Sequence, residues 1–257
     1  MNPDKRITIA TTILLSLFLN LAQAQNQTIE TQFVSVSDGL ASPFVRDVIQ
    51  DSYGLIWVAT NNGVQKYDGL KWETFKNIPG KSTSIQSINA WGLAEDANRN
   101  IWVANERGVS KYDRIRNVFV NYDFEAEFAL YEGAGRTFNV FMDSQQRVWA
   151  TTQFVDLVYF DPEADKWVYP KYEIPNIKDP THNGISLSFA EDKDGGLWFG
   201  SFIHGLMYRP KKGDAFRPVV LKNQPASFFI ESENSITALF FDPNGVLWIT
   251  TLEGVYK

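Results

Sequence analysis

Residues 51–68, DSYGLIWVATNNGVQKYD, and residues 96–113, DANRNIWVANERGVSKYD, are two copies of one pattern. In each copy an Asp is followed six residues later by a Trp inside a short apolar run, and the same pairing occurs five times. The five pairs are Asp51/Trp57, Asp96/Trp102, Asp143/Trp149, Asp192/Trp198 and Asp242/Trp248. Successive tryptophans are 45, 47, 49 and 50 residues apart. A repeat of this length, built of short strands and turns, is typical of a β-propeller blade.

One repeat predicts four antiparallel strands. In the second copy an apolar segment precedes an Asp/Asn-rich turn, and a continuous apolar run holding the Trp follows it. Two further strands come after Gly-containing or polar turns. We therefore expect an all-β propeller domain over residues 25–257, with repeats near 44–76, 88–122, 137–169, 185–220 and 236–257. The five tryptophans are expected to pack between blades, and the fifth repeat has only three strands.

The sequence allows either a closed or an open arrangement of the blades. Residues 32–36 (QFVSV) precede the first repeat and are predicted to form an outer strand. This strand, near residues 31–36, would complete the fifth blade and close a ring of five. The alternative is an open arc, or part of a larger seven-bladed propeller, with exposed faces at both ends.

The N-terminus has the features of an exported protein. Lys5 and Arg6 precede an apolar run at residues 7–21, and Ala22-Gln23-Ala24 gives a small-x-small cleavage pattern. Residues 1–24 are therefore predicted to be a signal peptide, cleaved near Ala24, which places the remaining chain in the periplasm or outside the cytoplasm. An uncleaved N-terminal anchor is the alternative.

Composition excludes several classes of partner. The chain carries a net charge of −6. Loss of residues 1–24, with two basic residues and one acidic residue, makes it −7. A protein this acidic, with no basic cluster in its sequence, is not expected to bind nucleic acid. The chain has no cysteine, so disulfides and thiolate metal sites are excluded, and no cofactor is expected.

The repeat pattern D-x-x-G-x-[IL]-W-[IVF]-[AGT]-T-x-x-G-[VL]-x-[KR]-[YF]-D resembles the two-component regulator propeller repeat, from about residue 44 to the end. This resemblance implies the exported sensor half of bacterial signal-transduction receptors. In such receptors the propellers precede a membrane helix and a histidine kinase or diguanylate cyclase. The third repeat departs from the pattern, because Val155-Asp156 replaces the glycine of the second turn.

The histidines and acidic residues do not form a catalytic motif in the sequence. His182 and His204 are the only histidines, and both are interpreted as surface loop residues. The sequence around Asp192 and Asp194 lacks the remaining ligands of a calcium loop. No metal site and no enzymatic activity are therefore predicted for this chain.

The loops provide the candidate binding residues. Loops between blades should share one face of a propeller with the turns between second and third strands. That face is predicted to carry Asn61, Arg107, Tyr131, Arg136, Phe154, His182 and His204. Aromatic, polar and cationic groups together suit oligosaccharides, particularly acidic ones.

The predicted function is a non-catalytic periplasmic sensor segment that binds a carbohydrate or related extracellular cue. Two alternatives remain open. One is a propeller lyase that uses a loop-face His as its base, and the other is a structural module that mediates homodimerisation.

Overall fold

A computed structural model describes residues 31–130, 132–174, 185–219, 236–252 and 254–257. The predicted signal peptide therefore lies outside the described residues. The chain divides into two units, residues 1–34 and 35–257. In the first unit the described residues form no helix or strand, and all the sheets belong to the second. None of the described residues belongs to a helix of the length and apolarity that a membrane span requires.

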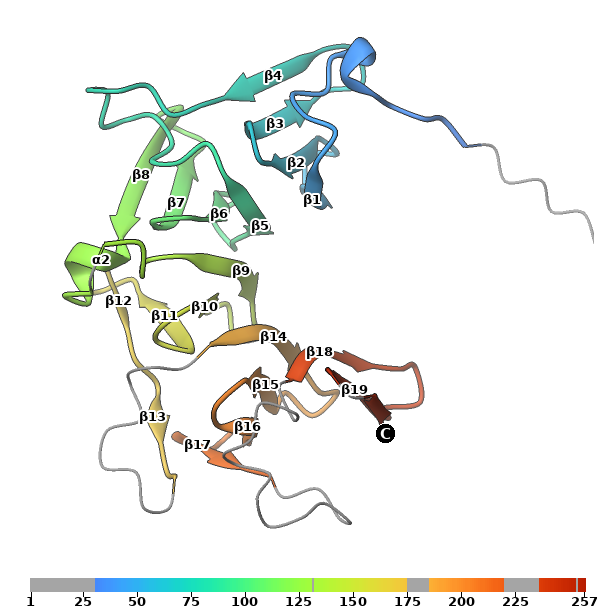
Figure 1. Cartoon of the computed structure of the whole chain (residues 1–257), viewed down its shortest axis with the longest axis vertical. Helices are drawn as coiled ribbons and strands as arrows, with labels where there is room; N and C mark the ends of the chain where they lie inside the picture. The colour runs from blue at the N-terminus through green and yellow to red at the C-terminus, as the bar shows by residue number, and fades with distance from the viewer. Residues whose placement is uncertain (1–30, 131, 175–184, 220–235, 253) are drawn as a thin grey trace, which may run out of the picture. The chain divides into compact units, whose positions relative to one another are not determined.

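The second unit consists of antiparallel sheets that follow one another along the chain (Figure 1). The first sheet contains β1 (Val45–Gln50), β2 (Ile56–Thr60), β3 (Gly63–Tyr67) and β4 (Trp72–Phe75). The second contains β5 (Ala90–Glu95), β6 (Ile101–Asn105), β7 (Gly108–Asp113) and β8 (Val118–Asp123). The third contains β9 (Thr137–Met142), β10 (Val148–Thr152), β11 (Leu157–Asp161) and β12 (Lys166–Val168). The all-β propeller prediction is confirmed.

The fourth sheet has one strand more than expected. It contains β14 (Ser186–Glu191), β15 (Leu197–Ser201), β16 (Gly205–Arg209) and β17 (Ala215–Pro218). At its edge, β13 (Lys171–Tyr172) pairs in parallel with β17, although the sequence predicts only a loop there. The fifth sheet contains β18 (Ile236–Phe241), β19 (Leu247–Thr251) and β20 (Val255–Tyr256). A single helical turn, α2 (Phe124–Glu127), follows β8.

The Asp–Trp spacing has a direct structural cause. In all five repeats the indole Nε1–H of the Trp donates to Oδ2 of the Asp, at 2.7, 2.8, 2.9, 2.9 and 3.2 Å in chain order. The other carboxylate oxygen accepts from backbone N–H groups of the intervening turn, as Asp51 Oδ1 does from Tyr53 and Leu55. The Asp therefore ties the turn between first and second strands to the tryptophan of the second strand.

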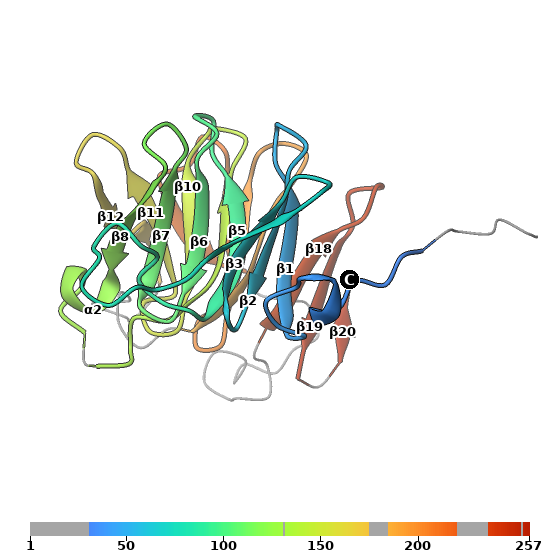
Figure 2. The same ribbon diagram turned by 90° about the horizontal axis from the view of Figure 1, so that it is seen from above.

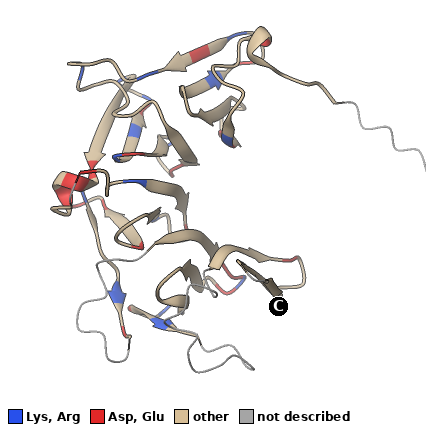
Figure 3. Cartoon of the chain, in the orientation of Figure 1, with Lys and Arg blue, Asp and Glu red and all other residues tan. Residues whose placement is uncertain are grey.

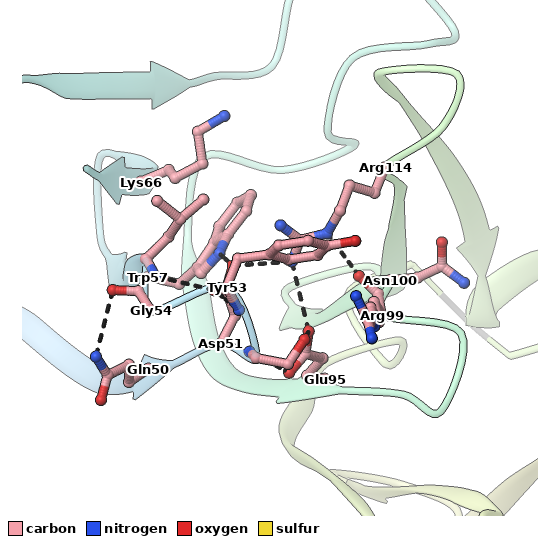
Figure 4. A network of polar contacts seen from close by, with 12 residues as sticks. Gln50, Asp51, Tyr53, Gly54, Trp57, Lys66, Glu95, Arg99, Asn100 and Arg114 are labelled. Atoms are coloured by element: carbon pink, nitrogen blue, oxygen red, sulfur yellow. Dashed lines mark hydrogen bonds and ion pairs between the residues drawn. The ribbon is translucent and has the colours of Figure 1, made fainter.

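The first of these pairs belongs to a larger polar network (Figure 4). The guanidinium of Arg114, from the next sheet, donates to Asp51 Oδ2 at 2.8 Å, and its Nη2 lies 3.6 Å from Glu95 Oε1. Glu95 in turn accepts from the backbone N–H and the hydroxyl of Ser52. These bonds connect the first sheet to the second on the side of the Asp turns.

The tryptophans pack against the next sheet in the chain. Trp57 lies 5.3 Å from Tyr112 and Trp102 lies 4.8 Å from Phe160, measured between ring centroids. Trp57, Trp102 and Trp149 are buried, Trp198 is half-buried, and Trp248 is 38% exposed. Burial of these large rings between sheets supplies much of the apolar area removed from water on folding.

The first strands of successive sheets approach each other closely. A Cβ on Gly92 of β5 would lie 2.6 Å from Asn139 Oδ1 and 2.9 Å from Asn139 Cα of β9, so only glycine fits at this approach. Figure 2 shows the sheets side by side from above. Large hydrophobic side chains are exposed on both the first sheet and the last: Phe44, Val45, Val48, Phe240, Trp248 and Val255.

The strand predicted near residues 31–36 is absent from the structure. Residues 31–35 have no strand conformation, and Val36–Asp38 form one turn of 3₁₀ helix, η1. The reason is local, because Ser35 and Asp38 form a capping box in which the Ser35 N–H donates to Asp38 Oδ2 at 2.9 Å. Gly39 then ends the turn in a left-handed conformation with φ of 99°. The prediction of a strand at this position is wrong.

Arg209 occupies a position that is aromatic in the preceding repeats. Tyr67 and Tyr112 stand at the equivalent place, because each pairs with the residue just before the Trp of its repeat, as Arg209 pairs with Leu197. The Arg209 guanidinium is buried 5.1 Å from the ring centroid of Trp149. Its Nε has no hydrogen-bond partner. Burial, together with the nearby charge of Arg147, lowers the pKa of Arg209 from its usual value, and Asp143 offsets part of this effect.

We expect Arg209→Tyr to raise the free energy of unfolding by about 1–3 kcal/mol, because replacing a buried charge by an apolar group of similar size is often stabilising. Urea denaturation followed by circular dichroism measures the change. Arg217→Tyr, at an exposed position, is the control and should leave stability nearly unchanged. Loss of stability in the Arg209 variant would show that its guanidinium has an essential partner.

Candidate ligand-binding face

The first strand of every sheet contains a β-bulge. The pairing register shifts between the first and second strands at Val45/Asp47, Ala90/Leu93, Thr151/Thr152, Ser186/Ser188 and Ile236/Ala238. Each of these strands is also the edge of its sheet. Bulges on edge strands re-aim side chains and are common beside functional sites. The residues displaced by the bulges include Arg46, Trp91, Phe138, Leu187 and Thr237.

Three of the bulged residues form a continuous row across three sheets. The guanidinium carbon of Arg46 lies 3.4 Å from the ring centroid of Trp91. Trp91 in turn meets the ring of Phe138 edge-on, with centroids 5.7 Å apart. Arg46 is exposed, whereas the two aromatic side chains are half-buried. Sequence analysis missed Arg46 and Trp91, although each stands five residues before the Asp of its repeat.

An ion pair lies beside this row. Arg136 Nε donates to Glu106 Oε2 at 2.6 Å, and the Trp91 indole N–H donates to Glu106 Oε1 at 3.2 Å. The Arg136 guanidinium also lies 5.7 Å from the Trp91 ring. Both oxygens of Glu106 are therefore engaged, and two guanidinium groups share one indole. Figure 3 shows basic residues on β1 and at the start of β9.

The charges of this cluster do not balance. It holds two guanidinium groups, Arg46 and Arg136, and one carboxylate, Glu106. Burial and the nearby charge of Arg136 lower the pKa of Arg46, although Glu106 opposes this shift. Arg46 remains a cation at any physiological pH. The cluster therefore presents one uncompensated positive charge at its exposed side.

Of the residues predicted from the sequence, only Arg136 belongs to this cluster. Asn61 accepts a hydrogen bond from the Ser42 hydroxyl and lies in the turn after β2. Arg107 forms an ion pair with Asp123, and Phe154 packs against the hydrophobic core between the second and third sheets. Tyr131 and His182 lie outside the described residues.

His204 is buried, so its interpretation as a surface loop residue is wrong. Its Nδ1 lies 2.6 Å from Asp156 Oδ2, and Asp156 also accepts from the Ser201 hydroxyl at 2.9 Å. Asp156 is 1% exposed and His204 is 6% exposed. The sequence could not reveal this contact, because Asp156 comes from the third sheet and His204 from the fourth.

Three cavities among the described residues have walls that do not include His204. The largest of these three, about 680 Å³, lies between the second and third sheets and includes Asp96, Lys111 and Arg147 in its wall. A second, about 380 Å³, is lined by the loop after β4 together with Arg107 and Asp123. The third, about 210 Å³, lies beside the same loop. Within the described residues, no three His, Asp or Glu side chains are close enough to hold a metal ion.

Comparison with known proteins identifies the repeats. The family model described as "Two component regulator propeller" matches residues 39–62, 179–202 and 231–253. Three segments of the chain are therefore similar to the two-component regulator propeller repeat. A curated relative, histidine kinase P4 of Formosa agariphila, is 35% identical over 81 residues, which are 32% of this chain and 6% of that protein.

Solved structures share the propeller fold. The extracellular domain of the hybrid two-component system BT3049 of B. thetaiotaomicron matches 87% of this chain and 30% of its own length, with a TM-score of 0.67 and 23% identity. Virginiamycin B lyase of Staphylococcus aureus matches 82% of this chain and 65% of its own, with a TM-score of 0.58 and 14% identity. The chain therefore spans less than a third of BT3049 and a small fraction of histidine kinase P4.

Proposed function

We propose that the chain is an exported, non-catalytic sensor segment of a two-component regulator, which binds an extracellular ligand. The regulator propeller repeats support the signalling role, and the extracellular location of the BT3049 domain supports export. The N-terminal segment with a signal-peptide pattern points the same way.

The ligand proposed is a carbohydrate. The observation that carries this proposal is the cluster in which Arg46 and Trp91, on bulged edge strands, lie beside Arg136 and Glu106. Aromatic rings pack against the apolar faces of sugar rings, while guanidinium and carboxylate groups hydrogen-bond to hydroxyls. The sheets hold Arg46 and Trp91 in place, while Glu106 and Arg136 come from the adjoining turn and loop.

A lyase is the second candidate function, favoured by one observation. His204 Nδ1 is held by Asp156, an arrangement that orients the imidazole so that Nε2 could act as a base. Against a lyase, His204 is buried and lines none of the three cavities among the described residues. Little of the His204 side chain is therefore accessible to a substrate.

Glycan-array screening of the secreted chain, followed by calorimetry with the best hits, tests the proposal. We expect binding of an oligosaccharide without consumption of it. The same mixtures analysed by mass spectrometry after long incubation provide the control for turnover. Cleavage that disappears in His204→Ala but persists in Arg46→Gln would overturn the non-catalytic assignment in favour of the lyase.

A further inference from the structure

We infer that Arg46 is the anchor for a carboxylate group of an acidic sugar, with Trp91 holding the guanidinium in position. The inference rests on the proposed function, because it specifies the ligand class of the same face. It assigns a role to Arg46 of β1 and Trp91 of β5. Neither residue belongs to the repeat pattern.

The first step is that Arg46 has no anionic partner. Among the described residues, no carboxylate lies within ion-pair distance of its guanidinium, and no hydrogen bond to it is formed. The nearest candidate, Glu106, already accepts from Trp91 and Arg136. Arg107 and Arg217, by contrast, form ion pairs with Asp123 and Glu173.

The second step concerns geometry. At 3.4 Å from the ring centroid, the guanidinium of Arg46 is stacked on the indole of Trp91. Stacking uses the face of a guanidinium and leaves its in-plane N–H groups free to donate. A carboxylate is planar and accepts two parallel N–H bonds from such an edge. The aromatic ring therefore immobilises the cation and orients it toward a planar anion.

The third step is the contrast with the rest of the protein. The chain has a net charge of −6, so most of its surface repels an acidic ligand at long range. The uncompensated cation of the cluster favours an anion at this position. The row continues from Arg46 through Trp91 to Phe138. A sugar ring attached to the carboxylate would therefore lie over aromatic side chains.

The test uses oligogalacturonates and alginate oligosaccharides as carboxylate probes, their reduced neutral counterparts, and sulfated galactans of similar length. Calorimetry is carried out on the secreted chain and on Arg46→Gln, Arg46→Lys and the charge-matched control Arg116→Gln. Arg116 is exposed and takes part in none of the contacts of the cluster. All variants change exposed side chains, and circular dichroism checks that each is folded.

We expect a carboxylate probe to bind the wild type and to lose affinity about 10- to 100-fold in Arg46→Gln, as for a hydrogen bond to a charged group. Arg46→Lys should recover part of the loss, because it retains charge but not the bidentate edge. Arg116→Gln should bind like the wild type.

The contrary outcomes separate the two proposals. Equal binding of the carboxylate probes by the wild type and Arg46→Gln would overturn this inference and leave the sensor proposal standing. Binding of sulfated galactans alone would overturn the carboxylate assignment. If no glycan of any class binds the folded chain, both the carbohydrate proposal and this inference fail.

Discussion

Replacing Asp51 by Ala is expected to lower the free energy of unfolding by about 3–5 kcal/mol, the usual cost of removing one partner of a buried ion pair. The Asp51 side chain is fully buried and accepts from the Trp57 indole at 2.7 Å and from Arg114 at 2.8 Å. Its loss would leave the buried Trp57 indole N–H without an acceptor and would remove the shorter of the two ion pairs of Arg114. Urea denaturation at neutral pH measures the change.

The fifth repeat provides a matched control for this prediction. Asp242 makes the same bond to Trp248, but at 3.2 Å and at the protein surface. Asp242→Ala removes the same motif where water can replace the lost acceptor, so its effect should be far smaller. Equal losses in the two variants would mean that the turn itself, rather than the buried ion pair, determines stability.

The same site should make stability depend on pH. Burial raises the pKa of Asp51, but hydrogen bonds from Arg114, Trp57 and two backbone N–H groups outweigh it and hold the pKa below its usual value. A carboxylate with a lowered pKa stabilises the folded state above its unfolded pKa of about 3.9, and this contribution is lost as the pH falls through the folded value. The stability difference between wild type and Asp51→Asn should therefore shrink on acidification below about pH 4. A difference that stays constant down to pH 2 would contradict the pKa assignment.

Local chemistry is what made much of the fold predictable from the sequence. The bond between Asp and Trp lies within six residues, so its signal survives in one chain without any knowledge of tertiary contacts. Arg99 and Gln146 replace glycine in two of the Asp turns, yet they adopt the same left-handed conformation, with φ of 66° and 65°. The turn therefore depends on the Asp side chain more than on glycine, and the repeat is recognisable in spite of these substitutions.

The parts that sequence analysis missed depend on contacts between sheets. Trp91 and Arg46 belong to different repeats, and the bulges that bring them together are not visible in the pattern of apolar residues. The two-residue strand β13 pairs in parallel with β17, more than forty residues later. A strand this short shows no alternation of apolar and polar residues by which it could be predicted. The signal that the sequence offered for the row is that Arg46, Trp91 and Phe138 each stand five residues before the Asp of their repeat.

Asp156 lies where the third repeat departs from the pattern, and this departure links two sheets. Gly63, Gly108 and Gly205 occupy the equivalent turn position with positive φ, and Asp156 has φ of 54°. Its carboxylate accepts from the Ser201 hydroxyl and meets His204 Nδ1. Ser201 Oγ accepts in turn from the backbone N–H groups of Ile203 and His204. The Asp therefore organises a turn of the neighbouring sheet.

We expect Asp156→Ala to cost about 2–4 kcal/mol of unfolding free energy, because it leaves buried donors on Ser201 and His204 without an acceptor and keeps a Cβ in a left-handed conformation. Asp156→Gly loses the same acceptor but relieves the backbone strain, which should recover about 1 kcal/mol relative to Ala. Asp156→Asn keeps an acceptor and tolerates the left-handed conformation, so it should be the mildest change.

The order of stability, wild type above Asn, then Gly, then Ala, separates the two roles of this residue. Denaturation curves of the four proteins under identical conditions give the order directly. If Gly matched the wild type, the carboxylate would contribute nothing and Asp156 would be an ordinary turn variant. If Gly fell below Ala, backbone strain would have no part in the result. The expected order would show that the Asp156 carboxylate, by joining the third sheet to the fourth, contributes more stability than the left-handed backbone of Asp156 costs.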